Sequence, residues 1–310
     1  MPAGDGSEGV SPHEEGASRQ VRPDRLLADL ERRKLESKLY NAYNDVADKL
    51  GVVGAYPWQV EFHNAGLANP ERMLMAANRV GKTSSAAAEV TIHMTGQYPK
   101  WWRGRKFDRG VRVWCGSVSS EASRDIIQHA LLGPMGRFGT GWVPKPLLIG
   151  DPKYRQAGVS EVVDQFHVKH SCGGISTCVL KTYEQGRKMW QGTSQDVIWL
   201  DEEPPMELYT EAITRTLDSK GLVVLTFTPL LGPSAVVQHF LEPQSTGIYT
   251  KNVTWEDAPH LDPVERERLW NSYPPHERET RASGQPMLGT GAVFPISDQA
   301  ISIPPFDLPA

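Results

Sequence analysis

Two segments of this 310-residue chain carry side chains that together would hold a nucleoside triphosphate. The first, Ala76–Thr83 (AANRVGKT), matches the phosphate-loop pattern G-x-x-x-x-G-K-S/T except for alanine at the first position. Gly81 would let the backbone wrap closely around phosphate, with successive N–H groups and a helix N-terminus facing the anion. Lys82 would reach the β and γ phosphates, and the Thr83 hydroxyl would bind Mg²⁺. This Walker A segment predicts ATP and Mg²⁺ as cofactors, bound by Ala77, Asn78, Arg79, Val80, Gly81, Lys82, Thr83 and Ser84.

The second segment, Asp196–Pro204 (DVIWLDEEP), is a run of apolar residues that ends in acids. A buried strand of this kind would place Asp201 in the magnesium shell, as a Walker B acid does. Glu202 would then lie beside the γ-phosphate, where it would orient or deprotonate the attacking water. Glu203 is a weaker candidate for the base, because its side chain should point away from that of Glu202. The alternative, an acidic surface turn, fits poorly with four apolar residues before the acids.

Two further segments have residue types that suit a nucleotide site. In Tyr56–Gln59 (YPWQ), an aromatic ring, assigned here to Trp58, would stack on adenine, and the Gln59 amide would pair with N6 and N7. That arrangement favours ATP over GTP, although the same residues would also suit a helix start packed on the core. In Thr226–Pro229 (TFTP), hydroxyls at the end of a strand, first of all that of Thr226, would sense the γ-phosphate. A threonine-rich strand end without such a role remains the alternative.

These segments must be positioned by elements that alternate between strand and helix. Apolar runs predict strands at 72–77, 111–116, 197–200, 221–227 and 248–254. Helices are predicted at 83–94, 119–132 and 235–241, a hairpin from 161–170 and 175–183, and a long loop at 133–160. The alternation predicts an α/β fold, a parallel sheet with helices on both faces. Together with the phosphate loop, it is the fold of a P-loop NTPase of the ASCE (RecA-like) class.

Composition divides the chain into five segments. Residues 1–20 lack apolar residues and are expected to form a disordered tail. Residues 21–54 have leucines at helical spacing and are expected to form a helical N-terminal segment, ahead of an ATPase core at 55–255. Residues 256–290, with a helix at 263–271, should form a small C-terminal lid subdomain, here called the lid segment. Residues 291–310 are Pro-rich and are expected to be a linker.

Charge and apolar patterning limit the partners of the chain. The formal net charge is −4, so any contact with nucleic acid must be a local patch or be shared among subunits. The segment Lys100–Lys106 (KWWRGRK) would touch phosphates or, alternatively, cover the core with its tryptophans. No apolar run is long enough for a membrane span and the N-terminus lacks a signal peptide, which predicts a cytoplasmic protein. The three cysteines have no metal-like spacing and are expected to be reduced thiols.

The combination of motifs resembles the large terminase subunit of tailed bacteriophages over about residues 55–295. The resemblance rests on Trp58-Gln59, Asn78–Thr83, Glu184–Gly192 (EQGRKMWQG), Asp196–Pro205, Tyr209, Glu211, Arg215 and Thr226–Gly232. It implies an ATP-hydrolysing motor that packages double-stranded DNA into a preformed capsid. It also implies as partners a portal protein, a small terminase subunit and further copies of the chain, in a ring that is commonly a pentamer when assembled and a monomer when isolated. Such a motor works in the host cell cytoplasm, transiently docked on the procapsid portal.

The resemblance also assigns roles by position. It makes Asp201 the Walker B acid and Glu202 the catalytic acid, and it matches Gln59 to the adenine motif and Thr226–Pro229 to the coupling motif. Arg79 lies inside the phosphate loop, where many members place an arginine that contacts the γ-phosphate.

The chain departs from the family pattern at one arginine. Many members have an arginine finger at the position of Gln191, and Arg187 lies one helical turn upstream. We therefore expect Arg187 to supply a charge to the neighbouring subunit, with Arg124 as a second candidate and an exposed surface arginine as the alternative.

A second departure concerns the nuclease domain that follows the ATPase in this family. A nuclease needs clustered carboxylates for two metal ions, and after residue 295 only Asp298 and Asp307 occur. Residues 291–310 are therefore expected to be a linker to an absent nuclease domain, and this chain is expected not to cut DNA.

Two other functions remain open from the residues alone. A helicase-like translocase would share Gln59 and the acids at 201–203, but it would need a second motor domain, and strand separation would reveal it. A nucleotide-binding assembly module would bind ATP tightly without turnover, even with DNA and partner proteins present.

Overall fold

A computed structural model describes residues 38–41, 55–156, 158–230, 232–242 and 246–286. The expected tail at 1–20 and linker at 291–310 lie outside these residues. Of the expected N-terminal helical segment, the described part is the short helix α2 (Lys38–Asn41), in which Leu39 packs against the core.

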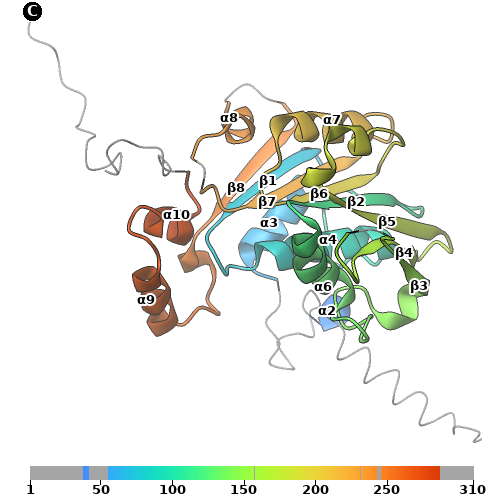
Figure 1. Cartoon of the computed structure of the whole chain (residues 1–310), viewed down its shortest axis with the longest axis horizontal. Coiled ribbons are helices and arrows are strands. Elements are labelled where there is room, and N and C mark those ends of the chain that lie inside the picture. Colours follow the sequence, from blue (N-terminus) through green and yellow to red (C-terminus); the bar gives the residue numbers. More distant parts are fainter. Residues whose placement is uncertain (1–37, 42–54, 157, 231, 243–245, 287–310) are drawn as a thin grey trace, which may run out of the picture. The chain divides into compact units, whose positions relative to one another are not determined.

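The core is one mixed sheet of eight strands in the order β3-β4-β5-β2-β6-β7-β1-β8 (Figure 1). The strands from β5 to β8 in this order run parallel, whereas β4 pairs antiparallel with both β5 and β3. The predicted parallel sheet and hairpin are therefore both present, and the hairpin extends the same sheet. The strand bounds are β1 (Glu71–Ala76), β2 (Arg112–Ser117), β3 (Leu148–Tyr154), β4 (Val163–Lys169), β5 (Ile175–Thr182), β6 (Val197–Asp201), β7 (Leu222–Phe227) and β8 (Ile248–Val253).

Helices cover both faces of this sheet, with α7 and α8 on one side and α4 and α6 on the other (Figure 1). Alternate residues of each strand face opposite sides, so Trp199 packs in the cluster with α4 and Ile198 in the cluster with α7. Strands buried on both faces need the continuous apolar runs that β6 and β7 have. The covering helices are α3 (Pro57–Ala65), α4 (Lys82–Thr95), α5 (Ser120–Ala122), α6 (His129–Leu132), α7 (Met206–Thr216) and α8 (Ala235–Leu241).

Several predicted elements differ from the structure. The predicted helix at 119–132 is continuous, but its middle, Ser123–Gln128, is a π-helical stretch between α5 and α6. The predicted loop at 133–160 was wrong in part, because it contains β3. That strand lies at the sheet edge, is largely exposed and contains Pro152, so it lacks the apolar pattern of the inner strands. Helix α7 was not predicted.

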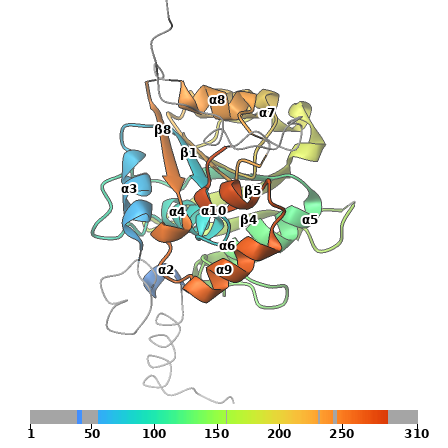
Figure 2. The ribbon, with the colours of Figure 1, turned by 90° about the vertical axis from the view of Figure 1, so that its left-hand side faces the viewer.

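The lid segment follows β8 and holds two helices, α9 (Pro263–Ser272) and α10 (Arg278–Ser283), of which only the first was predicted. Figures 1 and 2 both show α9 and α10 as neighbouring helices. Helix α10 ends at Gly284, whose φ of 67° is left-handed. A Cβ on Gly284 would lie 2.8 Å from the Ala76 backbone, so glycine lets the end of α10 approach the end of β1. Within the described ranges, no helix is both long and apolar enough to cross a membrane.

Candidate nucleotide-binding site

The phosphate loop connects the end of β1 to the start of α4, as predicted. Arg79 (φ 68°) and Gly81 (φ 98°) both have left-handed backbones, which curl the loop. As far as the described chain extends, the backbone N–H groups of residues 79–84 donate to no other protein group. A curled loop with free N–H groups at a helix N-terminus is a ready site for an anion such as phosphate.

Lys82, at the start of α4, reaches across to the end of β7. Its Nζ donates a hydrogen bond of 3.0 Å to the Thr228 hydroxyl. That hydroxyl also lies 2.8 Å from the Ala76 carbonyl oxygen and 3.0 Å from Asn78 Oδ1. Thr228 therefore joins the end of β7 to the phosphate loop.

Asp201, the last residue of β6, is 2% exposed and accepts a 2.7 Å hydrogen bond from the Thr226 hydroxyl. Burial, with the nearby Glu202 charge, raises the pKa of Asp201 to about 7, while Thr226, Lys82 and the Thr83 hydroxyl act in the opposite direction. The Thr83 hydroxyl interacts with the Asp201 carboxyl, and hydroxyl and carboxylate oxygens are the hard ligands that suit Mg²⁺. The residues present therefore fit a magnesium ion.

Thr226 lies near the end of β7, as predicted, and sensing of the γ-phosphate by its hydroxyl stays a prediction. Its hydroxyl is fully buried, accepts a 2.8 Å hydrogen bond from Trp199 Nε1 and donates to Asp201. It is therefore an internal partner of the Walker B acid, and Thr228 is the threonine of this segment that contacts Lys82.

Glu202 follows Asp201 with a left-handed backbone, φ 63°, which is rare for a residue with a side chain. Its N–H donates 2.8 Å to the Thr226 carbonyl oxygen, and the Tyr183 hydroxyl lies 3.0 Å from the carbonyl oxygens of both Asp201 and Glu202. Burial raises the pKa of the Glu202 carboxyl, and the charge of Lys82 opposes this rise. A carboxylate with a raised pKa is the stronger base.

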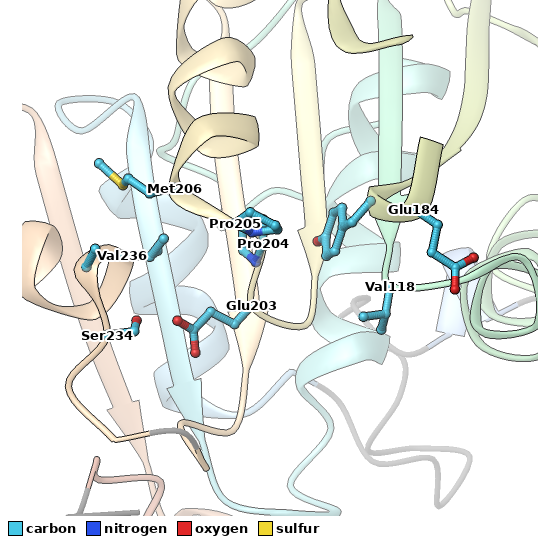
Figure 3. Close-up of a pocket in the computed structure, with 10 residues that line it drawn as sticks. Val118, Glu184, Glu203, Pro204, Pro205, Met206, Ser234 and Val236 are labelled. Carbon is cyan, nitrogen blue, oxygen red and sulfur yellow. The ribbon is translucent and has the colours of Figure 1, made fainter. Parts of the chain in front are cut away.

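Glu203 borders a different cavity of about 500 Å³. Figure 3 shows its carboxylate beside Ser234, among mostly apolar walls. Burial raises the pKa of Glu203, and the Ser234 hydroxyl opposes the rise. The described lining contains no residue of the phosphate loop; it consists of Val118, Tyr183, Glu184, Glu203, Pro204, Pro205, Met206, Ser234, Ala235 and Val236.

The predicted adenine segment forms the start of α3. Gln59 Oε1 accepts the Tyr56 N–H at 2.9 Å, which caps the helix, so base recognition by Gln59 remains a prediction. Trp58 is only 4% exposed and belongs to the hydrophobic core. A ring buried to this extent leaves no open face for adenine, which corrects the assignment of stacking to Trp58. Tyr56 is the ring of this segment that is partly accessible.

The lid segment and its flanking residue Trp255 contact the phosphate loop directly, and no sequence pattern predicted these contacts. The Asn78 N–H donates 2.8 Å to the Arg281 carbonyl oxygen, and Trp255 Nε1 donates 2.9 Å to the Asn78 carbonyl oxygen. His260 Nε2 lies 2.9 Å from the carbonyl oxygen of Arg79. The separation in sequence is 177 residues for Trp255 and 181 for His260, so only the tertiary fold brings these partners together.

The two candidate finger arginines, Arg187 and Arg124, each form an ion pair within this chain. Arg187, on a short 3-10 turn, pairs with Glu211 through Nε at 3.1 Å, yet its side chain is 56% exposed. Arg215 pairs with the other oxygen of Glu211 at 3.0 Å. Arg124 pairs with Asp125 at 2.7 Å on the π-helical stretch.

The basic segment Lys100–Lys106 is anchored to the core by its second tryptophan. Trp102 is 1% exposed, stacks on His63 with ring centroids 5.3 Å apart, and donates from Nε1 to the Arg105 carbonyl oxygen. The Arg103 and Lys106 side chains of the same segment are exposed. The packing alternative for this segment therefore holds for Trp102, and contact with DNA phosphates remains a prediction for the exposed charges.

The sheet order, the curled loop before α4 and the acids at the end of β6 together define the fold of a P-loop NTPase. A family model described as "Terminase large subunit, T4likevirus-type, N-terminal" matches residues 73–301, and the chain belongs to this family.

The chain is 39% identical over 274 residues to the terminase large subunit of Salmonella phage P22, covering 82% of this chain and 54% of that protein. It is 40% identical over 110 residues to that of Enterobacteria phage LP7, covering 36% and 23%. The chain thus spans about half the length of the first of these relatives, and the match to the second covers less.

Solved structures share the fold at low sequence identity. The large terminase ATPase domain of Thermus phage P74-26 has a TM-score of 0.54 at 16% identity, covering 79% of this chain and 98% of that domain. The large terminase of another thermophilic bacteriophage, in complex with ADP, has a TM-score of 0.53 at 13% identity, covering 73% and 52%. At such identities the likeness concerns the fold alone.

Proposed function

We propose that this chain is the ATP-hydrolysing motor portion of a phage DNA-packaging terminase, which drives double-stranded DNA into the procapsid. One observation carries the proposal: Lys82 of the phosphate loop bonds to Thr228, just past β7, and Thr226 of β7 bonds to the buried Asp201 at the end of β6. The phosphate loop and the acids Asp201 and Glu202 therefore lie at the same edge of the sheet. Family membership supports the packaging role, and the donor set supports ATP with Mg²⁺.

In the proposed reaction, the N–H groups of the loop and Lys82 bind the phosphates of ATP. Thr83 and Asp201 would hold Mg²⁺, which when bound neutralises charge on the phosphate oxygens. Glu202 accepts the proton of a water whose oxygen attacks the γ-phosphorus, and ADP leaves as the bond to the β-phosphate oxygen breaks. The low exposure of Asp201 and the partial burial of Glu202 limit how far bulk water weakens these charges.

Two arginines and one glutamine are proposed to complete the site. Arg79 would contact the γ-phosphate from within the loop, and Arg187 would serve the site of a neighbouring copy. Gln59 would pair with adenine through the part of its amide that the helix cap leaves unused.

Coupling to movement is proposed to pass through Thr228. When Lys82 turns to a γ-phosphate, its bond to Thr228 is exchanged for one to phosphate, and the contacts of Thr228 with Ala76 and Asn78 change with it. Because Asn78 is held by the lid segment and Trp255, its shift would be passed on there. The moving surface would grip DNA in a homo-oligomeric ring docked on a portal protein, with a small terminase subunit selecting the DNA.

The test is ATP turnover by wild type and Glu202→Gln, alone and with DNA and portal. We expect Glu202→Gln to keep ATP affinity and to lose turnover by about 10²–10⁴-fold, because it keeps the shape of the side chain but not the base. Equal turnover in the two proteins would contradict the role of Glu202. Tight ATP binding by wild type without turnover, even with DNA and partners present, would instead favour a nucleotide-binding assembly module.

A further inference from the structure

Contacts from the lid side fall on consecutive peptide groups of the phosphate loop. Arg281 and Trp255 hold the N–H and the carbonyl oxygen of Asn78, and His260 holds the carbonyl oxygen of Arg79. The proposed reaction uses the loop but gives His260 no role.

The hydrogen bonds of His260 define its tautomer. A carbonyl oxygen only accepts hydrogen bonds, so His260 Nε2 carries a proton and donates it to Arg79 at 2.9 Å. In the neutral ring Nδ1 is then the acceptor, and the Tyr56 hydroxyl, 2.8 Å away, donates to it. The Tyr56 and His260 rings are also stacked, with centroids 5.8 Å apart and planes 5° apart. Tyr56 therefore holds His260 at Nδ1, and His260 bonds to the phosphate loop through Nε2.

The bond to Arg79 controls the direction of the next N–H group. In a planar trans peptide the carbonyl oxygen and the following N–H point in opposite directions. Holding the Arg79 carbonyl oxygen on His260 therefore turns the Val80 N–H away from His260, as one of the loop donors without a protein acceptor in the described chain. The left-handed backbone of Arg79 costs free energy and needs such support.

From this geometry we propose that His260 is a positioning residue of the phosphate site. It orients the peptide between Arg79 and Val80 so that the Val80 N–H serves a nucleotide phosphate, and Tyr56 keeps the imidazole in place. This inference rests on the proposed function, because it concerns the same triphosphate.

The experiment compares His260→Ala and His260→Gln in the full chain, with fluorescent ATP as a direct binding probe and unlabelled ATP and ADP as competitors. Glutamine can still donate from Nε2 to the Arg79 carbonyl oxygen but lacks the ring that stacks on Tyr56. His276→Ala is the matched control, because this other lid histidine pairs only with Glu277, at 3.7 Å, among the contacts described. Thermal unfolding of each variant is measured alongside.

We expect His260→Ala to bind ATP and ADP about fivefold to tenfold more weakly, the effect of one lost net hydrogen bond. His260→Gln should stay within about twofold of wild type, since it keeps a donor to Arg79. His276→Ala should bind ATP like wild type, and every variant should unfold well above the assay temperature, so that weaker binding by His260→Ala does not reflect unfolding.

Two results would overturn the positioning role: His260→Ala binding as tightly as wild type, or His260→Gln binding as weakly as His260→Ala. Failure of the proposed function looks different, because wild type itself would then bind no ATP.

Discussion

At the scale of single residues, Thr228 is the point where β7, β1 and the phosphate loop meet. Its hydroxyl contacts Lys82 at the start of α4, Ala76 at the end of β1 and Asn78 in the phosphate loop. The hydroxyl of Thr226, two residues earlier, instead donates its hydrogen bond to the Asp201 carboxylate. The two threonines therefore have different partners, and we expect a change at Thr228 to affect the phosphate loop more directly than a change at Thr226.

We expect Thr228→Val to reduce ATP turnover about tenfold while ATP affinity changes less, because valine keeps the shape but removes the hydroxyl that links Lys82 to Ala76 and Asn78. Steady-state kinetics and a binding titration measure the two effects separately. Thr214→Val is the control, since Thr214 is exposed on α7 and bonds only within that helix. A Thr228→Val protein with unchanged turnover would show that coupling does not pass through this hydroxyl.

At the scale of elements, α3, β1 and α4 are joined by a buried ionic cluster. Glu89 on α4 contacts Arg72 of β1 through both oxygens and His63 of α3 at 2.6 Å, and His93 lies 3.4 Å from it. All four side chains are 0–1% exposed. The cluster fixes α4, the helix that follows the phosphate loop, relative to α3, the helix that carries Gln59.

This cluster predicts a pH-dependent stability. Burial lowers the pKa of His93, and the nearby charge of Glu89 opposes that shift. A histidine with a lowered pKa contributes stability above its unfolded pKa, about 6.5, that is lost as the pH falls toward the folded value. The Glu89 carboxyl has a pKa well below its usual value, so its contribution is lost only at more acidic pH. Wild type should therefore lose stability relative to His93→Gln as the pH falls below about 6.5.

The comparison between the two chains is necessary because Asp201 acts in the opposite direction. Its pKa is raised to about 7, so protonation stabilises the folded state as the pH falls below that value. Asp201 is the same in both chains, and its effect cancels in the difference. Denaturant unfolding at several pH values without Mg²⁺ gives that difference. If the difference in the free energy of unfolding between wild type and His93→Gln stays constant from neutral to mildly acidic pH, His93 does not cause the predicted pH dependence.

The sequence predicted inner elements better than edges and long-range contacts. Strands β6 and β7 were clear because burial on both faces requires unbroken apolar runs. Strand β3 was missed because an exposed edge strand imposes no such pattern. The phosphate-loop and β6 segments could be predicted from the sequence because the residues of each are contiguous. The distinction between Thr226 and Thr228 depends on the register that pairs Asp201 with Thr226 across β6 and β7, which no local pattern reveals.

At the scale of the whole molecule, we expect assembly of several copies to bring one further side chain, that of Arg187, to the nucleotide site of a neighbouring copy. The chain carries the loop, the acids and the lid contacts, but Arg187 faces outward from its pair with Glu211, more than half exposed. Glu211 is 5% exposed and has Arg215 as a second partner, so it stays neutralised if Arg187 is removed. Arg187 can therefore be changed without leaving a buried charge unpaired.

In an assembled ring we expect Arg187→Ala to lower DNA-stimulated ATP turnover by about 10³–10⁵-fold, because a finger in trans stabilises charge on the transferred phosphoryl group. The ATP affinity and unfolding midpoint of the isolated variant should match those of wild type, since the site that Arg187 serves lies on another copy. Arg137→Ala, an exposed arginine outside the basic segment and the nucleotide site, is the control for a general loss of surface charge. If the Arg187→Ala ring turns over ATP like wild type, Arg187 is an exposed surface residue, and the same measurement on Arg124→Ala examines the second candidate. Mixed rings make the distinction sharper, because wild-type subunits beside Arg187→Ala neighbours should fail only at the shared interface.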